Sequence, residues 1–276
     1  MHSQGRSGCR NLATAALTLI LAAGFSTAGY AGAITGASTG EGESIGLTLV
    51  PIIPGANVTI TSGPLPVASG TAPGAYNVSN SAASVSVLGV LSTGILNVAA
   101  SSNVTGNVDA PGFAQSSAVV NALSLNILSL LGISAATIST SANVSGGYGA
   151  LVATGGTTIE NLVIAGLGAV GATITPSAND VVLNVLGVTI TLNKQTITGD
   201  GTSNLSMITD GIDIEFNNAI AIINGVTGDL IGAIDIGISE ASLTAIPDSV
   251  PEPSSLAGIV TGLGMLAFLR RHRQRT

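Results

Sequence analysis

The sequence predicts an all-β fold, an antiparallel sandwich- or barrel-like domain built from hairpins. Three segments, at 188–193, 212–216 and 234–239, alternate apolar and polar residues. A period of two places every second side chain on one face, so each segment is expected to form a strand with one buried face. Charged residues make up only 8% of the chain and aliphatic residues are abundant. This composition indicates a folded body with an aliphatic core, because disordered chains are poor in apolar residues.

Short dipeptides lie between these segments and predict the turns. They are Asp-Gly at 200–201 and 210–211, and Asn-Gly at 224–225. Such pairs suit the positive φ angles of tight hairpin turns. Short strands joined by hairpins favour an antiparallel sandwich or barrel.

An internal repeat keeps a second fold open. Residues 84–106 resemble residues 124–146 at an offset of 40 positions, with Gly106 matching Gly146. We interpret the pair as a duplicated strand–turn–strand unit, since a repeat array usually needs three or more copies. A β-solenoid is the alternative fold, because a repeat in a Ser-, Thr-, Asn- and Gly-rich chain is also typical of solenoids.

The first 33 residues have the parts of a secretory signal peptide. Arg6 and Arg10 form a basic stub, an apolar run covers 12–25, and small residues at 31–33 offer a cleavage site. We therefore expect a signal helix at 1–33 that is removed on export. Cys9 lies within it, so the mature chain is expected to have no disulfide.

Residues 249–276 have the parts of a membrane tail. Val-Pro-Glu-Pro-Ser-Ser at 250–255 precedes an apolar run that we expect to form a transmembrane helix at 254–269. A basic cluster follows and marks the cytoplasmic end as a stop-transfer signal. This cluster consists of Arg270, Arg271, Arg273 and Arg275.

The order of these tail segments closely resembles the PEP-CTERM sorting signal. The resemblance implies that an exosortase, a membrane processing enzyme of Gram-negative bacteria that make exopolysaccharide and biofilm, acts on the tail. It also implies that Pro251, Glu252 and Pro253 form the recognition site for that enzyme. These residues would be a substrate site, not a catalytic one.

The body between the two ends is expected to cover 34–248. Its expected parts are an irregular lead-in at 34–80, the duplicated unit at 82–146 and a hairpin region at 157–243. The segments at 119–146, 157–162 and 188–195 resemble the choice-of-anchor P family of exported β-rich surface proteins. That resemblance implies an extracellular role and no particular activity.

Charge is distributed unevenly along the chain. Lys194 is the one basic residue between Ile34 and Asp248, and thirteen acids lie in the same span. Such a body should repel nucleic acid and anionic membranes and could attract cations. The alternative is that the acids simply keep an apolar protein soluble.

The residue types restrict the chemistry. His2, His272 and Cys9 lie in the terminal segments, so histidine-based triads and thiolate zinc sites are excluded from the mature body. Asp210, Asp213 and Glu215 could contribute oxygens to a calcium site, with Asp210 at a turn and the other two on one strand face. The alternative is a solvated acidic face. Calcium is the only cofactor that the sequence suggests.

These observations predict a non-catalytic, exosortase-processed protein of the cell surface or biofilm matrix. It would be anchored in the inner membrane by its C-terminal helix before processing. Exopolysaccharide or sister molecules are its expected partners, and nucleic acid is not. A calcium- or carbohydrate-binding module and a carboxylate-based glycan hydrolase are the alternatives.

Overall fold

The structure, a computed structural model, describes residues 32–247 except 54, 88, 108, 109, 128, 129 and 224, together with Arg270. Residues 1–31 of the expected signal peptide, the recognition residues at 251–253, the expected membrane helix, and Arg271, Arg273 and Arg275 lie outside the described residues. No helix in the described part of the chain is long and apolar enough to cross a membrane. The body forms one compact unit, Ala31–Pro247.

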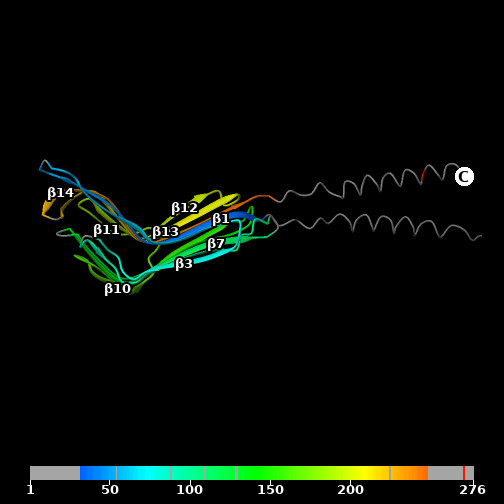
Figure 1. Cartoon of the computed structure of the whole chain (residues 1–276), viewed down its shortest axis with the longest axis horizontal. Helices are drawn as coiled ribbons and strands as arrows, with labels where there is room; N and C mark the ends of the chain where they lie inside the picture. The colour runs from blue at the N-terminus through cyan, green and yellow to red at the C-terminus, as the bar shows by residue number, and fades with distance from the viewer. Residues whose placement is uncertain are drawn as a thin grey trace, which may run out of the picture. The chain divides into compact units, whose positions relative to one another are not determined.

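The described body is all-β, and every strand pair in it is antiparallel (Figure 1). Its strands are β1 Ala33–Pro51, β2 Val58–Ala72, β3 Tyr76–Ala82, β4 Ser86–Val87, β5 Leu91–Ser92, β6 Leu96–Ser102, β7 Gly112–Ile127, β8 Leu131–Gly146, β9 Val152–Ile164, β10 Gly168–Ile174, β11 Asp180–Val185, β12 Val188–Gly199, β13 Asn204–Ile223 and β14 Val226–Ala245. The predicted all-β, antiparallel character is confirmed.

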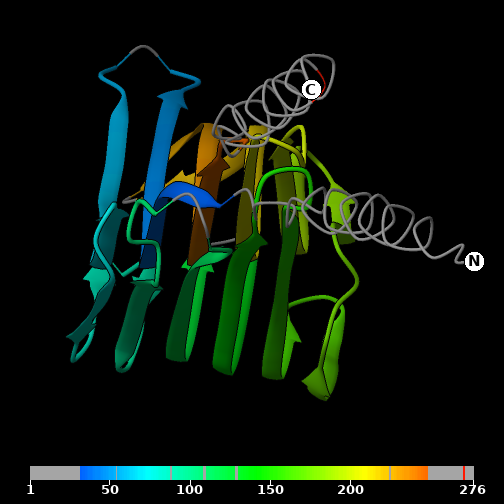
Figure 2. The same ribbon diagram turned by 90° about the vertical axis from the view of Figure 1, so that its right-hand side faces the viewer.

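The strands form two open sheets. The six-stranded sheet has the order β11-β12-β13-β14-β1-β2, and the eight-stranded sheet contains β3 to β10. Figure 2 shows how the strands lie side by side within each sheet, with the β1–β2 hairpin at one lateral edge. Strands β1, β13 and β14 face β7, β8 and β9 across the interior. Neither sheet closes into a barrel, and a β-solenoid would stack parallel strands, which the antiparallel pairing rules out.

The core between the sheets changes character along the strands. One half is filled by Leu, Ile, Val and Phe side chains, including Leu49, Ile159 and Phe216. In the other half the buried side chains are mainly Ala, Val and Leu, such as Ala114 and Ala142, and Ser and Thr hydroxyls bridge the sheets. Ser116 Oγ donates to the carbonyl of Glu240 at 2.7 Å. Because buried polar groups need partners, such bonds fix how the two sheets face each other.

A transverse irregularity, which we call the crease, crosses four strands of the six-stranded sheet. Asn193, Gly211, Gly237 and Gly42 occupy one row of the pairing register, one on each of β12, β13, β14 and β1. Asn193 has a φ of 50° and Gly237 a φ of 68°, a left-handed conformation that asparagine and glycine adopt most readily. The crease therefore lies where the sequence supplies residues that tolerate it.

The crease reverses which side chains face inward. Leu192 and Asn193 are consecutive yet both buried, as are Gly211 and Ile212, whereas regular strands alternate. In the eight-stranded sheet, Ala122 and Asn161 also have positive φ angles. Figure 1 shows both layers of the body bending near mid-length, with the six-stranded sheet on the concave side.

Several sequence expectations differ from the structure. The Asp-Gly pair at 210–211 lies inside β13 and belongs to the crease, so the predicted turn there is wrong. Residues 34–80 are not an irregular lead-in, because β1, β2 and most of β3 lie there as paired strands. Pro64 and Pro66 lie in β2, which is an edge strand and therefore tolerates residues that cannot donate to a ladder.

Candidate functional site: an acidic cluster at the crease

The outer face of the six-stranded sheet carries six carboxylates around the crease. They line a depression of about 460 Å³ on the concave side of the bend. We call them the acidic cluster: Glu41 on β1, Asp210, Asp213 and Glu215 on β13, and Asp235 and Glu240 on β14. With Lys194 as the one cation among them, the formal charge is −5 when all are ionised.

The crease itself gathers these side chains. Asp210 and Asp213 are three residues apart, which in a regular strand would place them on opposite faces. The phase reversal at Gly211 and Ile212 turns both toward the outside. Asp235 lies directly opposite Asp213 in the register of β13 and β14, so three acids from two neighbouring strands meet.

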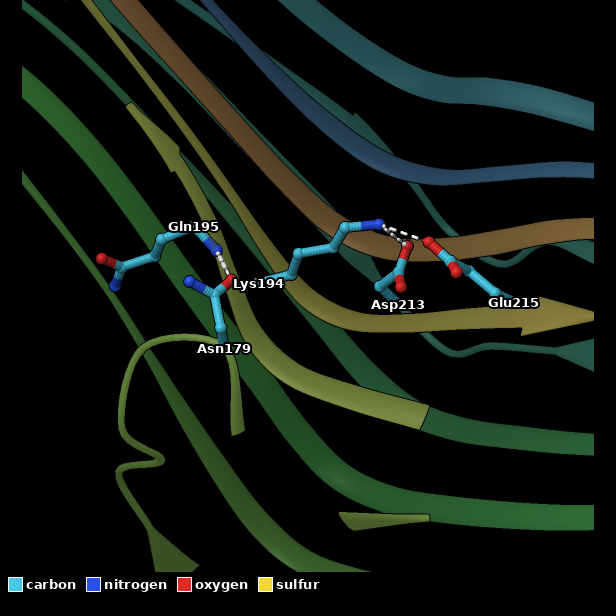
Figure 3. A network of polar contacts seen from close by, with 5 residues as sticks. All are labelled: Asn179, Lys194, Gln195, Asp213 and Glu215. Atoms are coloured by element: carbon cyan, nitrogen blue, oxygen red, sulfur yellow. Dashed lines mark hydrogen bonds and ion pairs between the residues drawn. The ribbon is translucent and has the colours of Figure 1, made fainter. Parts of the chain in front are cut away.

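The backbone beside Lys194 is fixed by polar side chains. Asn193 is only 4% exposed; its amide group donates to the Pro176 carbonyl at 2.9 Å, and its Oδ1 accepts from Thr157 at 3.1 Å. On the other side of Lys194, the backbone amide of Gln195 donates to Asn179 Oδ1 at 2.8 Å (Figure 3). These bonds hold β12 in the conformation that directs Lys194 over the outer face.

Lys194 bridges two of the acids. Its Nζ donates to Asp213 Oδ2 and to Glu215 Oε1, each at 2.8 Å (Figure 3). The two pairs differ in burial, since the side chain of Asp213 is 3% exposed and that of Glu215 is 56% exposed. The bond to Asp213 is therefore the less screened of the two.

Asp213 is the most enclosed acid of the cluster. Its second oxygen, Oδ1, is buried and has no hydrogen-bond partner among the described residues. One carboxylate oxygen from each of Asp210, Asp213 and Asp235 lies within 4.8 Å of the other two. A buried, unpaired carboxylate oxygen is costly, so this geometry leaves a place for a proton or a cation.

Burial and repulsion raise the pKa values of three acids in the cluster, Asp235, Asp210 and Glu41. Burial, a hydrogen bond to Asp213 and repulsion from Asp210 raise the pKa of Asp235 to about 7. Burial, followed by repulsion from Asp213, raises the pKa of Asp210 to about 6. Burial and then Glu240 raise the pKa of Glu41. The cluster therefore changes its charge between about pH 5 and pH 8.

Lys194 keeps its charge throughout this range. Burial opposes its ammonium form, but the bonds to Asp213 and Glu215 outweigh burial and raise the pKa of Lys194. Glu43, on the same strand as Glu41, is a separate buried acid that accepts from Ser62 at 2.9 Å. Burial raises the pKa of Glu43 as well.

The predicted calcium residues are partly brought together. Asp210 and Asp213 do meet, but Glu215 is held by Lys194 and is not among the three closest carboxylates. The sequence interpretation missed Asp235 because the alternation of its strand marked it only as solvated. Its position opposite Asp213 needs the strand register, which no local pattern supplies.

The depression is lined by acids, Lys194, two small polar residues, one alanine and two isoleucines, with no aromatic side chain among the described lining residues. Aromatic faces are the usual platform for sugar rings, so the chemistry of this lining favours cations and protons. No family model, curated protein or solved structure matches the chain.

Proposed function

We propose that this chain is an exported, non-catalytic structural or interaction protein of the bacterial surface or biofilm matrix. Its tail resembles a PEP-CTERM sorting signal, and its body resembles choice-of-anchor P proteins. The expected partners are an exosortase-type processing enzyme and then exopolysaccharide or sister molecules. The proposed role needs neither catalysis nor a cofactor. It agrees with a body that contains no histidine and no cysteine, since those of the chain all lie in the terminal segments.

One feature of the fold supports this proposal most directly. The strand that leads toward the tail, β14, lies inside the six-stranded sheet and is paired with β1 on one side and β13 on the other over nearly its whole length. Both β13 and β14 have 20 residues, which corresponds to about 65 Å of extended chain. A force on the tail would therefore load two long ladders of hydrogen bonds in shear.

The entry and exit of the body lie together. Ala33 pairs with Ala245 at the start of β1 and the end of β14. The hairpin tips β1–β2 and β13–β14 lie at the other end of these strands. A body attached through its C-terminus would hence present its tips away from the attachment point, as a surface protein requires.

The proposal is tested by replacing Pro251, Glu252 and Pro253 together with alanine in cells that make the protein. The expected result is that the variant keeps its tail and stays in the inner membrane, while the parent chain reaches the surface or the medium. Pro247→Ala, which leaves the tail unchanged, is the matched control. Equal export and equal mass of variant and parent would refute processing at this signal.

A second experiment addresses the structural role. Deleting the gene should reduce cell aggregation or alter matrix composition. The Lys194→Met and Pro247→Ala chains, returned to the deletion strain, should be compared for how far each restores the aggregation and matrix composition of the parent strain. If aggregation and matrix composition stay unchanged in the deletion strain, the structural role is wrong even if the export is right.

A further inference from the structure

We propose that Asp210, Asp213 and Asp235 bind one divalent, oxygen-preferring cation of the calcium class. This inference goes beyond the proposed surface role and does not depend on export. It revises the ligand set that the sequence suggests, with Asp235 in place of Glu215.

The separation of the three carboxylates fits a single ion. Ca²⁺ binds oxygens at about 2.3–2.6 Å, so two oxygens on one ion lie no more than about 5 Å apart. The three oxygens lie within 4.8 Å of one another. One ion could thus contact all three without movement of the strands, whose register fixes Asp213 opposite Asp235.

The orphaned oxygen of Asp213 independently indicates a ligand. The residue is 2% exposed, and its Oδ1 is buried without a partner in the described part of the chain. Its other oxygen, Oδ2, is already bonded to Lys194. A cation among the three carboxylates would give Oδ1 the partner that the protein does not provide.

The surroundings can complete the coordination. Ca²⁺ takes six to eight oxygens, from carboxylates, other protein oxygens and water. Glu41, Glu240 and the Ser44 hydroxyl line the same depression, and its open side admits water. Lys194 stays on Asp213 Oδ2 and Glu215, where it orients Asp213 and limits the net charge. Glu215 is therefore a partner of Lys194 and not a ligand.

The same oxygens compete for protons. A protonated Asp235 can donate to the Asp213 carboxylate, and this hydrogen bond is the second cause of the raised pKa of Asp235. The charged groups that face this pair are Glu41 from β1, Lys194 from β12, Asp210 and Glu215 from β13, and Glu240 from β14. Binding of the cation to the acid form must release the proton to water, so binding weakens as the pH falls.

Calorimetric titration of CaCl₂ into the full chain, purified in a non-ionic detergent and freed of metal with EDTA, tests the proposal. At pH 8 we expect one ion per chain with a Kd of about 10⁻⁴–10⁻³ M, the range of extracellular calcium modules. At pH 5 the affinity should fall at least about tenfold. At pH 6.5, buffers of different ionisation enthalpy should show the release of about one proton.

Matched variants separate a site from general screening. Asp235→Asn and Asp210→Asn should each weaken binding by about tenfold or more, since even loss of a residue that only supports a metal ligand costs 10- to 100-fold. Asp229→Asn, on the same strand but six residues from Asp235, should bind as the parent does. Circular dichroism checks that each variant is folded.

Three outcomes would overturn the proposal. The first is no binding heat at 10 mM CaCl₂ and pH 8 for the folded parent. The second is equal weakening by Asp229→Asn and Asp235→Asn. The third is a CaCl₂-induced rise in the thermal midpoint of unfolding that NaCl of matched ionic strength reproduces. If an acid variant does not fold, the binding heat of the folded parent at pH 8 and the NaCl comparison decide the question.

Discussion

Replacing Asp235 with asparagine should stabilise the protein at neutral pH in the absence of divalent cations. Asparagine has nearly the shape of the protonated acid, and it removes one charge from a cluster of like charges. In the folded protein the pKa of Asp235 is raised from 3.8 to about 7. The folded state thus binds this proton more tightly than the unfolded state does, and the parent loses stability as the pH rises from about 4 through 7.

The size of the gain follows from the pKa difference. Each pH unit between the two pKa values is worth about 1.4 kcal/mol, so the upper bound is about 4 kcal/mol. Water in the open depression screens the charges, and we expect a gain of about 1–2 kcal/mol at pH 8. For a body of this length that is about 2–8 °C in Tm. The gain should be smallest near pH 4 and constant above pH 7.5.

Urea denaturation of parent and variant in EDTA, at pH 4 and pH 8, measures this difference. Asp229→Asn is the control and should show the same small effect at both pH values. A variant that is less stable than the parent at pH 8, or a difference that does not depend on pH, would show that the acidic cluster does not repel itself as the geometry implies.

Three substitutions test the architecture around the cluster by urea denaturation. Lys194→Met should cost about 1–3 kcal/mol at pH 8, because it leaves a buried carboxylate without its cation, and the loss should shrink on adding CaCl₂; no loss would mean that the ion pair is not stabilising. Gly211→Ala should cost about 1–3 kcal/mol of unfolding free energy, because a Cβ there would lie 2.6 Å from Ile138 Cγ2. The control Gly46→Ala, whose Cβ would meet no atom of the described residues within 4 Å, should be neutral, and equal effects would refute tight packing at the crease. Asn193→Ala should cost about 2 kcal/mol through lost hydrogen bonds and a φ of 50°, and Asn193→Gly should cost less because it relieves the backbone; the opposite order would show that the φ angle is not what asparagine supplies.

The strands could be predicted from sequence because their alternation is local. Segments 188–192 and 212–216 have the period of two that a half-buried strand requires, and both lie in strands of the six-stranded sheet. The segment at 234–239 shows where this logic stops. Ile234 and Ile236 face the core as expected, but the crease at Gly237 turns Ile238 toward the acidic depression and Ser239 inward.

The crease did leave a signal in the sequence. In β13 the inward residues run through Leu205 and Met207 and then change phase at Ile212 and Ile214, so the apolar alternation slips by one position. An Asp-Gly pair at that slip is also what a hairpin turn requires, and local chemistry does not distinguish the two. Only pairing along the full length of β14 shows that the strand continues.

The acidic cluster needed information that no single segment holds. Glu41 and Asp235 are almost 200 residues apart in the chain, and antiparallel pairing of the first and last strands brings them to one depression. Composition indicated that the body would attract cations, and it could not show where. Long-range register, set by burial of one face of each strand, decides the site.

The most direct test of the central claim is the mass of the mature protein recovered from cells and medium, with both termini read. An exported protein of the surface or matrix should begin near Ile34 and end near Pro251. A chain that still ends at Thr276 and stays in the inner membrane would mean that the tail is a permanent anchor, and it would contradict the proposed role in the matrix.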